Sequence, residues 1–176
     1  MMRKTRFVSC VAVVAAILSG CSLIGTHAES KPACDGFDLA HSGESLGSGT
    51  RLRNELENAA TRPGPVRFID ITRAAGWSDD WTRMVEVPAG TKGAELNSVA
   101  HTTESCWKGL PAVPDDDQAA VDYFLFIKDE PGANSRPVQA VQQSSGNIGR
   151  IYFHNNEPLT TESVLIAGGK ALVAQP

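Results

Sequence analysis

The chain predicts an α+β fold, in which a mainly antiparallel sheet carries one or two short helices packed on one face. Three observations support this class. Segments with strand composition follow one another, separated by turn signals and without a helix between each pair. Two segments at most have helical periodicity. One strand, Val121–Lys128, is apolar on both faces and therefore belongs at the centre of a sheet.

Two segments are expected to be helical. Thr50–Ala60 has apolar residues at helical spacing, and the prolines at 63 and 65 end it. Thr91–Ala100 has the same spacing, with Thr91 as the N-terminal cap. The residues expected to face the core are Leu52, Leu56, Ala59 and Ala60 in the first helix and Leu96, Val99 and Ala100 in the second.

The clearest strand is Val121–Lys128. Its odd-numbered residues should face one side of the sheet and Phe124 and Phe126 the other. The turn signal at 129–132 makes the more polar segment Pro137–Gln143 its hairpin partner. The other expected strands are Val66–Thr72, Thr82–Val87, Ile148–His154, and a last hairpin of Ser163–Ala167 with Ala171–Ala174.

The first residues have the layout of an export signal. Arg3, Lys4 and Arg6 form a positively charged start, and the apolar run 7–18 follows. This run is about 18 Å long as a helix, which is too short to cross a hydrocarbon layer about 30 Å thick. The segment is therefore interpreted as a signal peptide and not as a membrane-spanning helix.

The signal segment ends in Leu18-Ser19-Gly20-Cys21, which resembles the lipobox of bacterial membrane lipoproteins. The resemblance implies cleavage before Cys21 and lipidation of Cys21 with acyl chains such as palmitate. It would place the protein on the extracytoplasmic side of the cell membrane, held there by these chains. The alternative is an ordinary signal peptide cut near residues 26–28, with a cysteine at position 21 by chance.

The resulting organisation has three parts: a signal peptide at 1–20, a flexible lipid-anchored tether at 21–33, and a single globular domain at 34–176. Removing Arg3, Lys4 and Arg6 from the 16 basic residues leaves 13 against 20 acidic ones, a net charge of −7. An acidic domain of this kind argues against nucleic acid as a partner, because binding to phosphates requires clustered cations.

Two cysteines remain after processing, Cys34 and Cys106. In an exported domain they are expected to form a disulfide, with two buried free thiols as the alternative. A metal site is not expected, because these cysteines lack the close spacing of zinc ligands and the histidines His27, His41, His101 and His154 are scattered. No cofactor is expected either.

The segment 43–47 matches the G-x-S-x-G pattern of serine hydrolases. Ser45 would be the nucleophile, with one of the aspartates at 115–117 and His154 behind it. However, the pattern requires a buried strand entering the turn, and residues 35–42 are not an apolar run. A serine- and glycine-rich loop that matches by chance is favoured, and no catalytic residue is assigned.

Acidic runs and tryptophans offer two further candidate sites, one for calcium and one for a partner. Asp79–Asp80 and the aspartates at 115–117 would be calcium ligands, but consecutive side chains diverge, so solvated loops are favoured. Trp77, Trp81 and Trp107 are expected in the core, with Trp107 beside the disulfide. The alternative places Trp77 and Trp81 on the surface as anchors for a partner.

Three functional hypotheses follow. The first is a lipid-anchored binding or protein-interaction module with an envelope protein as partner, which predicts an exposed apolar patch. The second is a small-ligand carrier or sensor, which predicts a void lined by Phe124, Phe126 and Tyr152. The third, a small serine hydrolase, predicts Ser45 within hydrogen-bond reach of a histidine.

Overall fold

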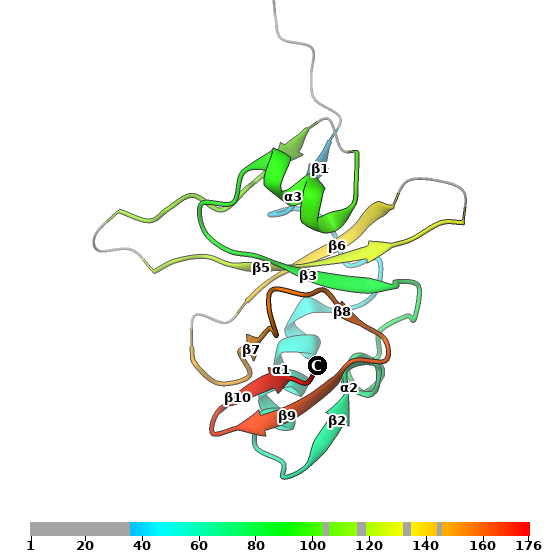
Figure 1. Ribbon diagram of the computed structural model, residues 1–176, viewed down its shortest axis with the longest axis vertical. Helices are drawn as coiled ribbons and strands as arrows, with labels where there is room; N and C mark the ends of the chain where they lie inside the picture. The colour runs from blue at the N-terminus through cyan, green and yellow to red at the C-terminus, as the bar shows by residue number, and fades with distance from the viewer. Residues whose placement is uncertain (1–35, 104–105, 116–118, 132–134, 144–145) are drawn as a thin grey trace, which may run out of the picture. The chain divides into compact units, whose positions relative to one another are not determined.

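The computed structural model describes residues 36–176 except 104–105, 116–118, 132–134 and 144–145 (Figure 1). The described residues all belong to one compact unit, Cys34–Pro176. The expected signal peptide, Cys21, the tether and Cys34 lie outside them.

The described part of the chain contains three helices and ten strands. The helices are α1 (Gly49–Ala60), α2 (Phe68–Ala74) and α3 (Gly93–Ala100). The strands are β1 (Phe37–Asp38), β2 (Pro65–Arg67), β3 (Arg83–Val87), β4 (Trp107–Lys108), β5 (Tyr123–Lys128), β6 (Arg136–Gln142), β7 (Ile151–Tyr152), β8 (Leu159–Thr160), β9 (Val164–Gly168) and β10 (Ala171–Ala174). The predicted α+β class is confirmed.

The strands form three sheets, which we call A, B and C. Sheet A pairs β1 with β4, sheet B has the order β2-β9-β10-β7, and sheet C has the order β6-β5-β3-β8. All pairings are antiparallel except β1 with β4 and β10 with β7. The expected hairpins β5–β6 and β9–β10 are both confirmed.

Sheet C separates two hydrophobic cores, and β5 contributes to both, as its apolar faces predicted. Phe124 and Phe126 point into the core that contains α1, α2 and the inner face of sheet B. Leu125 and Ile127 point into the other core, against α3, β1 and β4. Figure 1 shows this arrangement, with α3 and β1 on one side of sheet C and sheet B on the other.

The prediction of one strand over Val66–Thr72 is wrong beyond residue 67. β2 ends there and α2 begins, although the residues are β-branched or aromatic. The buried residues of α2 are Phe68, Ile69, Ile71 and Thr72, which is the spacing of one helical face. Arg67, in the position before α2, binds Asp70 in its first turn with contacts of 2.9 and 3.0 Å. Packing and this local pair override strand propensity here.

The two predicted helices are confirmed with changes at α3. It begins at Gly93 after Lys92, and the Thr91 hydroxyl donates to the Pro88 carbonyl instead of capping the helix. Leu96 and Ala100 are buried as expected, but Val99 is 37% exposed, so its inward placement is wrong. Of the expected strand Ile148–His154, only β7 has strand geometry.

Candidate functional site: an apolar row on sheet B

Four apolar side chains form a row across the outer face of sheet B. Tyr152 of β7 lies opposite Val173 of β10, and Val173 lies opposite Ile166 of β9. Ile166 in turn lies opposite Pro65 of β2. The row therefore crosses all four strands, although its residues come from three distant parts of the chain. We call it the sheet B row.

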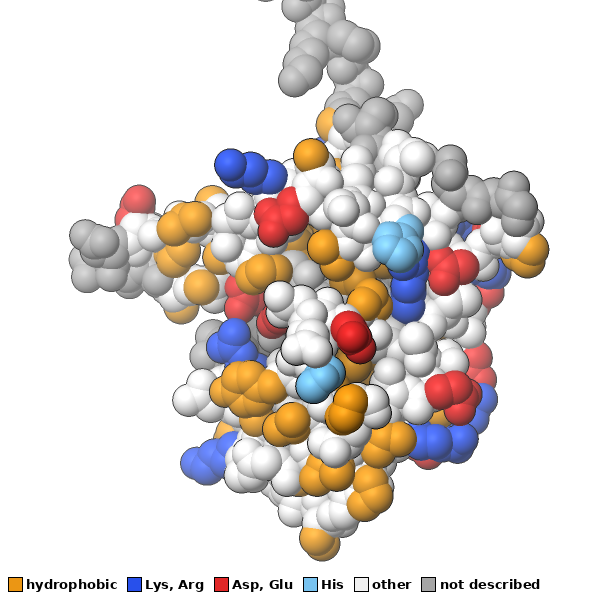
Figure 2. Space-filling view, in the orientation of Figure 1, with side chains coloured by type: hydrophobic (Ala, Val, Ile, Leu, Met, Phe, Trp, Pro, Cys, Tyr) orange, Lys and Arg blue, Asp and Glu red, His pale blue; other side chains and the backbone are white. Residues whose placement is uncertain are grey.

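Strand alternation explains why the row faces outward. The neighbours Ile151, Leu165 and Leu172 point into the core against α1, so the residues next to them point the other way. Tyr152 is 53% and Val173 38% exposed, while Ile166 is half-buried by its neighbours. Figure 2 shows hydrophobic side chains gathered over β9 and β10 on this face. Nothing in the described part of the chain covers it.

Cationic groups lie at the β7 end of the row. The Arg150 guanidinium lies over the Tyr152 ring, 5.9 Å from its centroid, and also approaches Asp122 at 3.6 Å. The Gly149 amide donates to the Lys170 carbonyl at 2.8 Å, which brings the turn between β9 and β10 to the same end. Lys170 makes no ion pair with any described residue.

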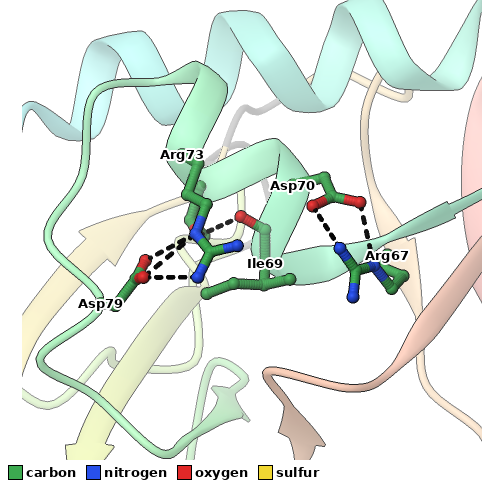
Figure 3. A network of polar contacts seen from close by, with 6 residues as sticks. Arg67, Ile69, Asp70, Arg73 and Asp79 are labelled. Atoms are coloured by element: carbon green, nitrogen blue, oxygen red, sulfur yellow. Dashed lines mark hydrogen bonds and ion pairs between the residues drawn. The ribbon is translucent and has the colours of Figure 1, made fainter.

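At the β2 end, the cation is already neutralised by a local partner. Arg67 and Asp70 form the two-pronged contact shown in Figure 3, and the hydrogen bonds and charge of Asp70 raise the pKa of Arg67. The two arginines beside the row are therefore both paired, Arg150 with Asp122 and Arg67 with Asp70. Lys170, in the turn between β9 and β10, differs from them in having no ion pair with a described residue.

The composition of the row is that of a contact surface. Exposed aromatic and aliphatic side chains beside arginine are the composition of the centre of a protein interface. An apolar surface that carries acidic groups would match both the row and its positive end.

The tryptophan prediction is resolved in favour of the core. Trp77 and Trp81 are buried, and both pack against Phe126, with ring centroids 4.7 and 5.3 Å apart. The Trp77 indole donates to the Ser48 carbonyl at 2.9 Å. The alternative of surface anchors at these two positions is therefore wrong, and the exposed apolar surface lies elsewhere.

Ser45 has a structural partner and not a catalytic one. Its hydroxyl donates to the Val138 carbonyl at 3.1 Å, on β6. Among the described residues, Ser45 has no hydrogen bond to a histidine. His41 instead contacts Asp38 at 3.3 Å, and His101 ends α3 in a left-handed conformation. Of the expected acids, Asp115 is exposed, and 116–117 lie outside the described residues.

The acidic pair Asp79–Asp80 is occupied by cations of the chain itself. Asp79 binds Arg73 at 2.6 Å (Figure 3), and Asp80 binds Lys128. Hydrogen bonds from these partners lower the pKa of both carboxyls. No group of three or more metal-ligating side chains occurs in the described ranges.

The void expected for a small-ligand carrier is not found among the described residues. Phe126 is fully buried against the rings of Phe68, Trp77 and Trp81. Tyr152, the third expected lining residue, is on the outer face of sheet B. The three side chains therefore do not surround a common space.

The disulfide prediction concerns one described residue, Cys106, which directly precedes β4. Cys34 lies outside the described residues, so the pairing stays a prediction. Gly36 nevertheless lies against Cys106, because a Cβ atom added at Gly36 would be 1.5 Å from the Cys106 carbonyl oxygen. Within the described part of the chain, no helix is both long and apolar enough to span a membrane.

Sequence reasoning missed the sheet B row, although a signal for it exists. Val164, Ile166 and Val173 occupy positions in β9 and β10 where alternation calls for polar residues on a solvated face. Reading this signal requires the register between distant strands, which the sequence does not give.

Comparisons with known proteins do not assign the chain to a family. No protein-family model matches the chain, and neither a curated protein nor a solved structure shows significant similarity to it.

Proposed function

We propose that this protein is a lipid-anchored binding module of the extracytoplasmic cell envelope, which docks a protein partner through the sheet B row. The anchoring half of the proposal is supported by the lipobox-like Leu18–Cys21 and the export signal before it. The acyl chains on Cys21 hold the domain at the membrane, since its acidic charge provides no grip on anionic lipid.

The observation that supports the binding half is the exposed row itself. Large uncovered apolar patches on soluble domains mark interaction sites. Burying a side chain such as Tyr152 or Val173 in an interface contributes on the order of 1–3 kcal/mol each. The charge of Lys170, which makes no ion pair with a described residue, then favours a partner that presents carboxylates beside its apolar groups.

The position of the row relative to the start of the domain fits a tethered binder. The chain enters the described unit at Gly36, next to β1, in the core on the opposite face of sheet C from sheet B. Gly36 and the sheet B row therefore lie on different faces of sheet C.

We also propose that Cys34 and Cys106 form the disulfide. The close approach of Gly36 to Cys106 supports it, because residue 34 is only two positions from Gly36. Closing a loop of roughly 70 residues would stabilise the domain by about 4 kcal/mol on the chain-entropy model. The bridge would fasten the entry of the chain to the β4 side of the domain.

The anchor is tested by replacing the lipidated residue. The Cys21→Ala protein should lose labelling by radioactive fatty acid and leave the membrane fraction, or accumulate with its signal peptide uncleaved. A Cys10→Ala variant, with a cysteine inside the signal segment, is the control and should be labelled normally. Unchanged labelling of Cys21→Ala would refute lipidation at this position.

The docking face is tested by cross-linking in cells, followed by purification and mass spectrometry. The double variant Tyr152→Ser with Val173→Ser should recover its main protein partner at least about fivefold less than the unchanged protein, as expected for loss of interface anchors.

The control is Val113→Ser, because Val113 is 72% exposed but lies outside the row. It should leave recovery unchanged. Equal recovery with all variants would refute docking at sheet B.

A further inference from the structure

A separate cleft lies between α3, the end of β3 and the segment before β8. It has a volume of about 130 Å³. Its lining residues are Glu86, Pro88, Thr91, Glu95, Leu96, Val99, Phe153 and Asn156. None of them belongs to the sheet B row, so this site is independent of the proposed docking surface.

The floor and sides of the cleft are largely apolar. Leu96 is buried beneath it, and Val99, on the same helix, is 37% exposed at its side. Phe153 is half-buried and packs against Phe124 with ring centroids 6.4 Å apart. The exposure of Val99, which helical periodicity placed in the core, is thus explained by its position at the edge of this cleft.

Two carboxylates reach the cleft from different elements. Glu86 of β3 is half-buried, and one of its oxygens accepts a hydrogen bond from the Gln143 amide at 3.1 Å. Glu95 is exposed on α3. Neither makes an ion pair with a described residue, unlike Asp79, Asp80 and Asp129, which all have cationic partners.

The cleft also borders an open stretch of strand. β8 pairs with β3 only at Arg83 and Met84, although β3 continues to Val87. No described strand lies beside Val85–Val87 on that side of sheet C. This leaves lateral room for a ligand along the end of β3.

We propose that the cleft binds a cationic alkyl group: an alkylammonium or alkylguanidinium, as in the side chain of lysine or arginine. A cleft with a volume of about 130 Å³ has room for a short alkyl chain with one charged head. The chain packs on Leu96, Val99 and Phe153, and the charged head pairs with the carboxylates that line the cleft, Glu86 and Glu95. A cation there offsets the cost of holding Glu86 partly out of water without an ion partner.

The minimal probes are n-butylammonium and n-butylguanidinium, with n-butanol as the neutral match of the same length. Titration of the full domain, followed by NMR of backbone amides, should show saturable shifts for α3 and residues 153–156 with the cations. Butanol should bind at least about tenfold more weakly, the factor expected for loss of a partly desolvated ion pair.

One double variant that removes the charge of both carboxylates, and one control outside the cleft, sharpen the test. Glu86→Gln with Glu95→Gln keeps the size of both side chains and should weaken butylammonium binding by at least about tenfold. Glu162→Gln removes one negative charge on an exposed turn before β9, where the double variant removes two, and should have no effect. The amide spectrum of each variant reports whether it is folded.

A tripeptide distinguishes between two sources of the cation, a basic side chain within a peptide and a free amine. If acetyl-Ala-Lys-Ala-amide binds more tightly than butylammonium, the cleft takes a basic side chain together with its backbone. Equal affinity means that a free amine suffices, and both results support the site. Equal binding of butanol, retained binding by folded Glu86→Gln/Glu95→Gln protein, or no saturable shift with either cation would overturn it.

Discussion

At the scale of single residues, Arg83 is the charged residue that is buried in the described part of the chain. Its side chain is 9% exposed and pairs with Asp129 at 3.0 Å. It also donates to the Ser135 hydroxyl and to the Ala100 carbonyl at the end of α3. A cation at a helix C-terminus is favourable, so one side chain connects β3, α3 and the β5–β6 connection.

Asp129 makes the contribution of these Arg83 contacts to folding stability depend on pH. Burial raises its pKa, but hydrogen bonds from Ser135 and Thr82 and the charge of Arg83 outweigh burial, so its pKa lies below the ordinary aspartate value. A folded-state pKa below the unfolded value of about 3.9 stabilises the fold at higher pH, and this contribution is lost as pH falls through the folded pKa.

Asp129→Asn should therefore lower the free energy of unfolding by about 1–2 kcal/mol at pH 7, as expected for charge-assisted hydrogen bonds, and by clearly less at pH 3. Urea unfolding at both pH values measures the difference. Asp79→Asn, which breaks an exposed pair, is the control and should change stability less. A loss for Asp129→Asn that is the same at both pH values would contradict this account.

At the scale of elements, the serine- and glycine-rich segment before α1 protects the edge of sheet C. β6 is an edge strand, and such edges invite pairing with other chains. The Ser42 hydroxyl donates to the Ala140 carbonyl and accepts from the Ala140 amide. The Ser45 hydroxyl reaches Val138 on the same strand. The segment 43–47, which matches the G-x-S-x-G pattern, thus belongs to a cover over the exposed edge of β6.

Gln139 holds this cover in place from within β6. It is 1% exposed, its side-chain oxygen accepts from the Leu46 amide at 2.8 Å, and its nitrogen donates to the Gly47 carbonyl at 2.8 Å. Gln139→Leu should lower the free energy of unfolding by about 2–4 kcal/mol, because two backbone groups lose their partners.

Ser45→Ala, which removes one exposed hydrogen bond, should cost about 0.5–1.5 kcal/mol. Urea unfolding of both variants provides the comparison. If Gln139→Leu is no less stable than Ser45→Ala, the segment does not depend on Gln139.

Sequence patterns predict elements well where local and tertiary preferences agree. β5 is apolar on both faces and lies at the centre of sheet C, between two cores. α2 has strand-like residues, yet its helical spacing and the Arg67–Asp70 pair decide its form. Val99 follows the periodicity of α3 but lies at a cleft, so periodicity alone cannot place it.

At the scale of the whole molecule, the candidate site depends on pairings that no local pattern specifies. β2 joins β9, and β7 joins β10 in parallel, so sheet B combines segments separated by about half the chain. The sheet B row exists only in this register. Sequence composition therefore predicts the class of fold and an exported, acidic domain, whereas the candidate surface becomes visible only when sheet B is assembled.

The most direct test of the central claim, docking through sheet B, is site-specific photo-cross-linking in cells. A photoreactive amino acid replaces Tyr152 in one strain and Val113 in another. The account predicts one dominant protein adduct from position 152, none from 113, and a weaker adduct at 152 when Val173→Ser is added. Equal adducts at both positions, or none at 152 while 113 reacts, would contradict it.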